Sequence, residues 1–345
     1  MVEFADIVTP VPREIWATVF PRDPYALETQ SPEWTDAMCA AGGYRDVSRL
    51  YETVDGRALV LPLLRRSWIP AASVDASNPR HCGAGGLLGS GGVSAGEIAA
   101  VLDDLSARPA LARSVWPGPL ELAAWRAAAP PGALTVAHRA HLLDLGAGWE
   151  GVWAGEFRGT ARRKVRRAEE AGVTVDCGTG GELVPELYRL MALAARRWAR
   201  RQHEPLWLTI RRLRYRDPPR KFEAIGRFLG ERFRVYLARV GGRPVAAVAL
   251  LQGTNAYYFR GALDERHSGN ANYLLHCRAI QAACAGGCRY YYLGDSGWSA
   301  GLAQFKEAFG ARACDYPEYR FERFPVSKVE HEVKQIVKRA IGFRD

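Results

Sequence analysis

The sequence lacks the features that mark membrane-spanning, secreted and disulfide-stapled proteins. None of its apolar runs approaches the ~20 residues that a membrane span needs. The N-terminus, MVEFADIVTPVPREIW, carries acids and prolines and no apolar segment typical of a secretory signal. The seven cysteines are odd in number and scattered, with no CxxC pair, which indicates reduced thiols. We therefore expect a cytoplasmic protein without a membrane span.

Several catalytic motifs are also missing. Gly-x-Gly-x-x-Gly occurs once, at 146–151, but after the expected strand at 134–144 and not after a first strand, and no Gly-x-x-x-x-Gly-Lys-Ser/Thr occurs, so dinucleotide and P-loop chemistry are unsupported. His-Glu-x-x-His is absent too, which argues against a zinc protease. Cys277, Cys284 and Cys288 lie near His276, but their spacing fits no standard zinc pattern, and we predict no metal site.

What the sequence has in excess is arginine. The net charge is +10 over 345 residues, and only six of the 47 basic residues are lysine. Arginine binds phosphate through two parallel hydrogen bonds, which lysine cannot do. The basic excess favours an anionic partner, which could be nucleic acid, coenzyme A or a phosphorylated substrate. Charge alone does not choose among them.

Hydrophobic periodicity and turn residues predict a similar order of elements in the two halves of the chain. In the first half we expect a helix, a hairpin turning at Asp55–Gly56, a glycine-rich loop and then alternating helices and strands, at 31–43, 46–66, 83–92, 94–107, 111–116, 119–128 and 134–144. In the second half we expect helices and strands at 157–172, 173–176, 181–202, 221–230, 233–263, 271–287, 288–294, 302–310 and 319–324. Residues 203–220 are expected to be a basic stretch broken by prolines, and 326–343 an amphipathic helix.

The block from 233 to 310 has the element order of the GNAT acetyltransferase fold. Its phrases GGRPVAA, GNANYLL and FKEAFGA resemble the Fem-type (FemABX) branch, which carries two GNAT-like lobes in one chain. The basic segment RRKVRRAEEAGV resembles the segment that opens the second lobe in that branch. The resemblance is good over roughly 157–324 and weaker over 31–144. It implies an α/β (α+β) fold of two tandem lobes packed face to face, each a mixed, mostly antiparallel sheet flanked by helices. The lobes are expected at 1–150 and 151–324, with a helix at 325–345 bracing them.

The loop before the expected helix at 271–287 is a candidate donor-binding site. Arg266, Gly269 and Ala271, with Asn270 between the last two, match the GNAT acyl-CoA pattern Arg/Gln-x-x-Gly-x-Gly/Ala. Glycine lets the backbone approach a phosphate, and amides at a helix N-terminus point at it. The alternative is an ordinary strand-to-helix turn with no ligand.

Phe305 and Lys306 are the candidates for donor binding and catalysis that depend most on the resemblance. On residue physics alone, Phe305 would be a core side chain and Lys306 a solvent-exposed one. In Fem-type enzymes the matching pair is implied to hold the terminal adenosine of tRNA and to stabilise the tetrahedral intermediate. An aromatic face does stack on bases, and an ammonium does stabilise an oxyanion.

Asp295 follows the expected strand at 288–294, at the end that should face the cleft. It is a candidate catalytic residue that orients or deprotonates the acceptor amine. An equally good interpretation is that Asp295 and Ser296 cap the following loop or helix. Tyr257, Tyr258 and Tyr292 alternate on strands, and the sequence does not say which of them faces the cleft.

Two helices carry dense arginine. Arg163 and Arg167 belong to the first and Arg197 and Arg201 to the second, and all four are candidates for binding the acceptor or a phosphate. A charge run is more often a solvated helix face. The Fem branch contacts a sugar-nucleotide diphosphate near the second helix, but this chain has arginines and Trp198 there, so its acceptor can differ.

Taken together, these observations predict an N-acyltransferase that forms an amide bond, with aminoacyl-tRNA as donor and no tightly bound cofactor. Acyl-CoA is the alternative donor, and a non-catalytic RNA-binding module is a third interpretation. tRNA is the expected partner. The acceptor is a small amine or a peptidoglycan-type or peptide amine.

Overall fold

The computed structural model describes residues 2–66, 73–108, 110–130, 133–297, 299–325 and the positions 328, 332, 335 and 336. The helix expected at 325–345 thus lies almost wholly outside the described residues. In the part of the chain that is described, no helix is long and apolar enough to cross a membrane.

In the first half the predicted elements form close to their expected boundaries, and further elements that were not predicted form at Phe4–Val8, Arg13–Val19 and Val74–Ala76. They are β1 Phe4–Val8, α1 Arg13–Val19, α2 Pro32–Ala40, β2 Arg45–Asp46, β3 Arg49–Thr53, β4 Ala58–Leu61, β5 Leu64–Arg65, β6 Val74–Ala76, β7 Leu88–Gly89, α3 Ala95–Ser106, β8 Ala112–Val115, α4 Leu122–Ala127 and β9 Leu134–Asp144. Ser31 caps α2 by accepting a hydrogen bond from the Trp34 amide. Gly56 turns the β3–β4 hairpin with a φ of 82°, which favours glycine.

The second half follows the predicted order with two additional α-helices, at Gly148–Gly151 and Leu206–Arg216. Its elements are α5 Gly148–Gly151, α6 Gly159–Glu170, β10 Thr174–Thr179, α7 Val184–Arg201, α8 Leu206–Arg216, α9 Pro219–Leu229, β11 Phe233–Val240, β12 Arg243–Gln252, β13 Ala256–Leu263, α10 Ala271–Ala285, β14 Tyr290–Asp295, α11 Ala300–Glu307 and β15 Arg312–Glu322. The expectation of a broken stretch at 203–220 is wrong, because Pro205 and Pro218 flank the helix α8 and do not interrupt it.

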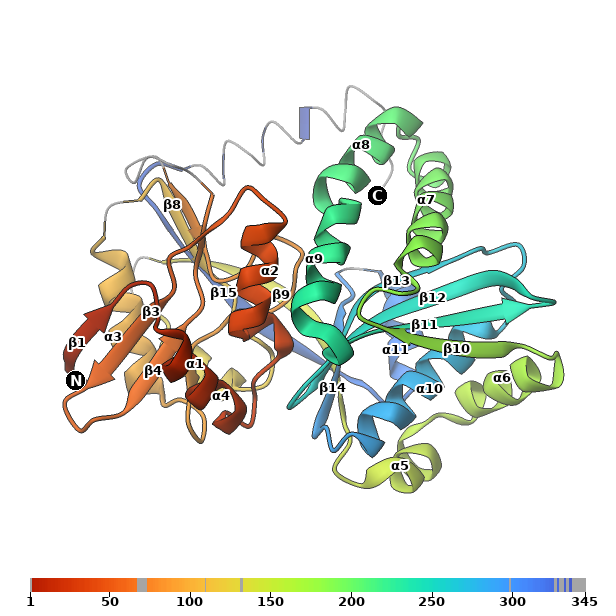
Figure 1. Cartoon of the computed structure of the whole chain (residues 1–345), viewed down its shortest axis with the longest axis horizontal. Helices are drawn as coiled ribbons and strands as arrows, with labels where there is room; N and C mark the ends of the chain where they lie inside the picture. Colours follow the sequence, from red (N-terminus) through yellow and green to blue (C-terminus); the bar gives the residue numbers. More distant parts are fainter. Residues whose placement is uncertain are drawn as a thin grey trace.

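Two sheets organise the chain. A four-stranded sheet has the order β1-β3-β4-β7, and an eleven-stranded sheet has the order β10-β11-β12-β13-β14-β9-β15-β8-β6-β5-β2. The long strand β15 pairs with both β9 and β8, and β9 pairs with β14 (Figure 1). The two halves therefore lie side by side in one continuous sheet. The expectation that they pack face to face is wrong, because β15 returns from the second half and extends the sheet of the first.

Helices cover the second half of this sheet on both faces. α7 and α9 pack on the face that carries Val235 and Leu237, whereas α6 and α10 pack on the face that carries Tyr236 and Ala238. These side chains alternate along β11, as the pleat of a strand requires. The prediction of a mixed α/β fold with large sheets flanked by helices is confirmed.

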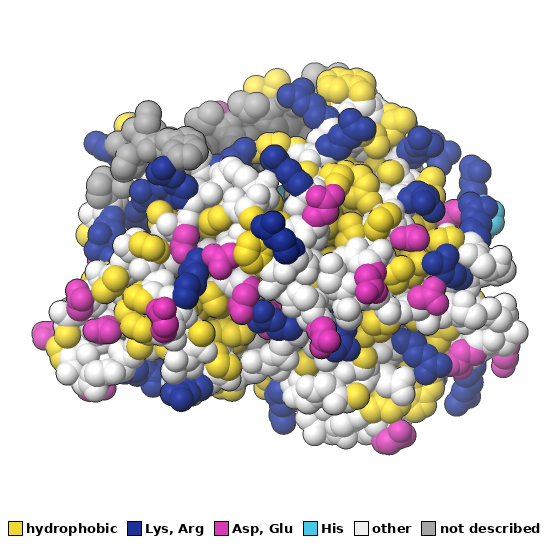
Figure 2. Space-filling model, in the orientation of Figure 1, with side chains coloured by type: hydrophobic (Ala, Val, Ile, Leu, Met, Phe, Trp, Pro, Cys, Tyr) yellow, Lys and Arg dark blue, Asp and Glu magenta, His cyan; other side chains and the backbone are white. Residues whose placement is uncertain are grey.

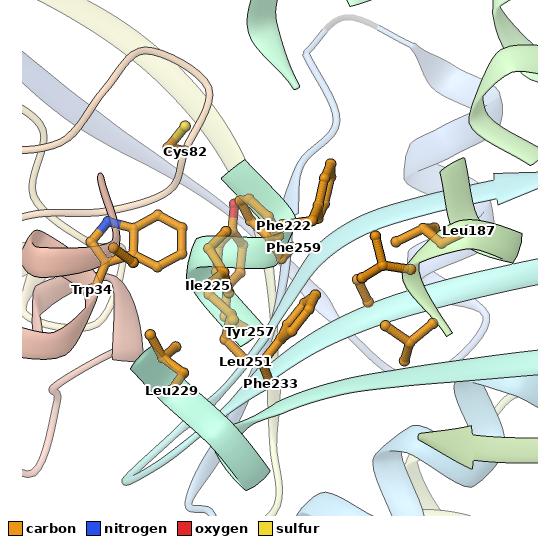
Figure 3. Close-up of a cluster of buried hydrophobic side chains, with 14 of the residues drawn as sticks. Trp34, Cys82, Leu187, Phe222, Ile225, Leu229, Phe233, Leu251, Tyr257 and Phe259 are labelled. Atoms are coloured by element: carbon orange, nitrogen blue, oxygen red, sulfur yellow. The ribbon is translucent and has the colours of Figure 1, made fainter. Parts of the chain in front are cut away.

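A buried cluster joins the two halves where α9 lies between α2 and the sheet. Trp34 of α2 packs edge-on against Phe259 of β13, with ring centroids 5.5 Å apart, and Phe222 of α9 is next to the same ring at 6.1 Å (Figure 3). The indole nitrogen of Trp34 also donates a hydrogen bond to Asn78 Oδ1. This packing fixes α9, and with it the neighbouring strand β13, against the first half.

Gly226 in α9 offers a test of how closely this helix packs on the turn after β10. A Cβ added there would lie 2.3 Å from the backbone oxygen of Gly180, so Gly226→Ala forces backbone to move. We expect a loss of ~1–3 kcal/mol in the free energy of unfolding, measured by urea denaturation. Gly159→Ala is the matched control, because a Cβ there meets nothing within 4 Å. Equal stability of the two variants would contradict the close approach.

Candidate active site

Lys306 is buried, contrary to what a lysine beside a core phenylalanine would suggest. Its side chain is only 1% exposed, and its Nζ donates to the backbone oxygens of Gly294 and Asp295, both at 2.8 Å. Because Phe305 and Lys306 are neighbours on α11, their side chains leave the helix in different directions. The two hydrogen bonds hold the Lys306 nitrogen under the C-terminal end of β14.

Burial lowers the pKa of Lys306 to about 8, and the nearby Asp295 carboxylate partly opposes that shift. Two of the three N–H groups of the ammonium are used by the carbonyls of Gly294 and Asp295. One N–H is left for another acceptor. The result is a cation in a low-dielectric setting that remains largely protonated at neutral pH.

The pairing between β13 and β14 ends next to this lysine. β13 and β14 are parallel, but their pairing is limited to Ala256 with Tyr291 and Tyr257 with Tyr292. Gly294, two residues further on, has a φ of 72°, which turns the end of β14. The strands are therefore unpaired towards their carboxyl ends, where Lys306 and Asp295 lie. In α/β sheets, ligands enter at the carboxyl ends of strands.

Asp295 is held by two tyrosines. Its Oδ1 accepts hydrogen bonds of 2.9 Å from the hydroxyls of Tyr292 and Tyr316, and its side chain remains 30% exposed. Burial raises the pKa of Asp295, while the hydrogen bonds from Tyr316 and Tyr292 act in the opposite direction. Tyr292 thus faces the site, and its ring stacks on that of Tyr257 at 4.8 Å.

The first half of the chain completes the site with residues that the sequence reasoning missed. His138 of β9 lies with its Nε2 2.8 Å from Glu318 Oε2 and its Nδ1 3.9 Å from Asp295 Oδ2. The ring of Trp116, which follows β8, stacks on His138 at 4.3 Å. The Trp116 indole nitrogen donates to the Tyr316 hydroxyl at 2.7 Å. No local motif marks these residues, because strand pairing across the two halves brings them to Asp295.

The predicted donor loop borders a different hollow. A groove of about 730 Å³ lies between α7, the start of α8 and the segment 263–267, and five arginines line it: Arg196, Arg197, Arg200, Arg243 and Arg266. Gly269 has a φ of 47°, and Asn270 precedes α10. The Ala271 amide bonds the Ser268 carbonyl within the turn. Neither Lys306 nor Asp295 lines this groove.

Acidic residues neutralise part of this groove. Glu265 is 2.6 Å from the Arg201 guanidinium and 3.9 Å from that of Arg197, and Asp264 is 3.0 Å from Arg243. Among the described residues, no ion pair is formed by Arg196, Arg200 or Arg266. These three arginines are the positive charges that remain for an anionic ligand.

The four predicted acceptor-binding arginines do not form a single site. Arg163 and Arg167 are exposed on α6, which covers one face of the sheet, whereas Arg197 and Arg201 belong to α7 on the other face. No single phosphate group can contact both pairs. A macromolecule that wraps around the sheet would be needed to reach all four.

Phe305 is half-buried. Its ring packs edge-on against Tyr273 of α10 at 5.0 Å and Phe309 at 5.2 Å, next to the buried His276. This packing matches the core interpretation of Phe305, and base stacking stays a prediction for the part of the ring that is exposed. Within the described residues, no group of three His, Cys, Asp or Glu side chains is arranged to hold a metal ion.

Comparisons with known proteins agree with this fold. Residues 155–307 match the family model described as the acetyltransferase (GNAT) domain. The crystal structure of FemX superposes with a TM-score of 0.67 at 14% identity and covers 96% of this chain and 100% of that chain. The structure of L-PGS from Bacillus licheniformis superposes with a TM-score of 0.52 at 13% identity and covers 97% of this chain and 98% of that chain. A protein of unknown function from Bacteroides thetaiotaomicron superposes with a TM-score of 0.54 at 10% identity, and the match covers 93% of this chain and 99% of that chain. No curated protein sequence matches the chain.

These similarities define the class of the fold. Residues 155–307 match the GNAT acetyltransferase domain, and the chain as a whole has the Fem-type GNAT fold. The resemblance predicted from GGRPVAA, GNANYLL and FKEAFGA is thereby confirmed. The domain and the fold support an acyltransferase, whereas the boundaries predicted for the two lobes stay a prediction.

Proposed function

We propose that this chain is an aminoacyltransferase that moves an aminoacyl group from aminoacyl-tRNA to a primary amine and forms an amide bond. The observation that carries the proposal is the buried Lys306 ammonium, held by two carbonyls near the Asp295 carboxylate, where the pairing of β13 and β14 has ended. A cation and a carboxylate side by side suit a reaction in which an amine attacks a carbonyl. The acceptor amine can be small or belong to a peptide or a peptidoglycan-type precursor.

The chemistry requires no redox step. The amine nitrogen attacks the ester carbonyl, the carbonyl oxygen becomes an oxyanion, and the 3′ oxygen of tRNA leaves and takes up a proton. The remaining N–H of Lys306 stabilises the oxyanion, because its position is fixed before the reaction begins. Asp295 accepts a hydrogen bond from the amine and orients it towards the carbonyl.

An exposed face of α8 supports tRNA as the donor. Trp207 and Tyr215 are 65% and 66% exposed, and Arg211 and Arg214 lie on the same side of the helix by their spacing. Figure 2 shows basic side chains gathered around exposed hydrophobic ones over α7 and α8. Aromatic rings that stack on bases, next to arginines that contact phosphates, are typical of surfaces that bind single-stranded nucleic acid.

Acyl-CoA is a second candidate donor, and the arginine-lined groove favours it. Arg266 lies in that groove, and Gly269 and Asn270 stand at the N-terminus of α10. Amides at a helix N-terminus and flanking arginines bind phosphates. In this alternative the leaving group is a thiol in place of the 3′ oxygen of tRNA.

The two donors can be distinguished directly. The protein is incubated with primary amines and either charged total tRNA or acetyl-CoA, and amide products are detected by mass spectrometry. We expect product from charged tRNA that disappears after RNase treatment. Product from acetyl-CoA that survives RNase would establish the alternative donor, and RNA binding without product would indicate a non-catalytic module.

The aromatic pair on α8 gives a more specific prediction. Trp207→Ala with Tyr215→Ala is expected to weaken binding of aminoacyl-tRNA by roughly 5- to 150-fold for each stacked base, equivalent to ~1–3 kcal/mol. Filter binding at fixed salt measures the change. Val54→Ala is the control, because Val54 is 69% exposed in the first half. Unchanged RNA affinity in the double variant would show that α8 does not contact the donor.

A further inference from the structure

The mechanism above leaves one proton unassigned. An amine at neutral pH carries an additional proton that it must lose before it attacks, and the leaving 3′ oxygen must gain one. Asp295 is engaged by two tyrosine hydroxyls, and the Lys306 nitrogen already donates to two carbonyls. A third group close to the amine is therefore needed. The first half of the chain supplies such a group.

We infer that His138 is the proton shuttle of the transfer reaction, oriented by Glu318 and positioned so that the acceptor amine lies between its Nδ1 and the Asp295 carboxylate. This inference rests on the proposed function. It names a catalytic group that comes from β9, in the first half of the chain, and that lies outside the matched GNAT domain at 155–307.

Glu318 sets the tautomer of the His138 imidazole. Burial alone would raise the pKa of Glu318, but hydrogen bonds from His138 and Arg320 outweigh it and lower the pKa. Glu318 is thus an ionised acceptor at neutral pH, only 3% exposed, with its Oε2 2.8 Å from His138 Nε2. Nε2 must carry the hydrogen of that bond. When His138 is neutral, its Nδ1 then has a free lone pair and can accept a proton.

The distance between His138 Nδ1 and the Asp295 carboxylate suits an amine nitrogen placed between them. Nδ1 and Asp295 Oδ2 are 3.9 Å apart, which is too far for a hydrogen bond between them. A nitrogen atom about 2.9 Å from each, the usual hydrogen-bond length, forms a triangle on that base with an angle of about 85° at the nitrogen. A primary ammonium can donate to both atoms in that arrangement. His138 and Asp295 are 20% and 30% exposed, so an amine can reach them.

Neighbouring side chains hold the His138 imidazole and the Asp295 carboxylate in place. Trp116 stacks on the imidazole at 4.3 Å, and its indole nitrogen donates to Tyr316, whose hydroxyl donates to Asp295. The imidazole and the carboxylate are thus connected through a single network. A catalytic pair held in this way loses little entropy when the substrate binds. Arg320 hydrogen-bonds both oxygens of Glu318, at 2.7 and 2.9 Å, and fixes the orienting carboxylate.

The proton balance closes without a co-reactant. The ammonium gives one proton to Nδ1 of His138, and the free amine attacks the ester carbonyl. The C–N bond forms, the tetrahedral intermediate collapses, and the C–O bond to tRNA breaks. The imidazolium returns its proton to the leaving 3′ oxygen, and the nitrogen loses its second proton to solvent as the amide forms. Glu318 keeps its charge throughout and stabilises the transient imidazolium.

The test compares His138→Ala with wild type in the full-length protein, with charged tRNA as donor and a primary amine as acceptor. We expect kcat to fall about 10²- to 10⁴-fold, the usual contribution of general acid–base catalysis, with little change in KM. Added imidazole should restore part of the rate in His138→Ala and none in wild type. With hydroxylamine, which is unprotonated at neutral pH, the same variant should lose much less activity. Glu318→Gln should show a smaller decrease in kcat.

Arg139→Ala is the matched control, because Arg139 is the next residue on β9 and pairs with the exposed Asp315. Its kcat should equal that of wild type. If His138→Ala keeps the wild-type kcat, or if its loss is equal for both acceptors and imidazole does not rescue it, the inference is wrong while the proposed function stands. If wild type forms no amide from charged tRNA or acetyl-CoA, the proposed function fails.

A measurement without turnover separates these cases further. Nitrogen-15 NMR of the neutral imidazole should show the hydrogen on Nε2 of His138, and Glu318→Gln should alter that signal. Adding methylamine as a probe should shift the Nδ1 resonance in wild type. A hydrogen found on Nδ1 of the neutral ring would overturn the inference whatever the activity.

Discussion

Lys306→Met is expected to lower kcat about 10²- to 10³-fold, with little change in the apparent affinity for either substrate. The physical reason is that the ammonium stabilises charge that exists only in the transition state, and a single oxyanion donor is typically worth that factor. Methionine keeps the length and apolar stem of lysine, so it fills the buried space without the charge. Steady-state kinetics with charged tRNA measure the effect.

The pH profile provides an independent check on Lys306. Because burial lowers its pKa to about 8, the ammonium form is lost as the pH rises through that value. We expect kcat/KM in wild type to have a falling alkaline limb near this pH and Lys306→Met to lack that limb. Lys221→Met is the control for the shape of the pH profile only. Lys221 is also a buried lysine, at 5% exposed, but it pairs with Asp217, so this variant should keep the alkaline limb even if the loss of that ion pair lowers the rate. A Lys306→Met enzyme with the wild-type kcat would rule out the oxyanion role.

The largest expected effect on stability comes from Asp217, at the junction of α8 and α9. Its carboxylate is fully buried and lies 2.8 Å from both Arg260 and Lys221 and 2.7 Å from Arg216. Asp217→Ala removes the only carboxylate in this set of contacts and leaves buried cations without a counter-charge. We expect the free energy of unfolding to fall by ~3–5 kcal/mol. Urea denaturation with circular dichroism measures the loss.

The pH dependence of stability follows from the same cluster. Burial alone would raise the pKa of Asp217, but Arg260 and Lys221 outweigh it and hold the pKa well below its usual range. The stabilisation is therefore complete above the unfolded-state pKa, ~4, and is lost as the pH falls below it. Asp217→Asn keeps the volume of the side chain and should remove the part of the unfolding free energy that depends on pH in the acidic range. Lys221→Met combined with Asp217→Asn should recover part of the loss. If Asp217→Ala costs less than ~1 kcal/mol, the cluster does not stabilise the fold.

This cluster also bears on the site. Arg260 of β13 donates to the backbone oxygen of His81, and the Lys221 nitrogen lies 3.2 Å from Cys82 Sγ, so two charged groups of the second half contact a loop of the first. Tyr257, three residues before Arg260, stacks on Tyr292, which bonds Asp295. The charged cluster and the catalytic residues are thus connected by adjacent side chains. Destabilising the cluster is expected to loosen the position of β13 as well.

Local patterns in the sequence determined most of the elements and part of the site. Apolar residues at helical spacing predicted α7, and Asp55–Gly56 predicted the first hairpin, because both signals depend on neighbours in the chain. Asp295 is the last residue of β14 and Lys306 lies on the next helix, so short-range connections alone bring the two together. These features could be predicted because the contacts that produce them are close in sequence.

The tertiary structure alone decided the rest. His138 and Glu318 are 180 residues apart, and they meet because β15 crosses back to pair with β9, which no local pattern encodes. The burial of Lys306 likewise depends on how α11 packs under β14, and solvent exposure would have been the expectation for an isolated helix. The arginines of α6 and α7 read alike in the sequence, but the sheet between them separates their sites. Long-range strand pairing and burial are set by the packing of the whole chain, and so the proton-handling part of the site becomes visible only in three dimensions.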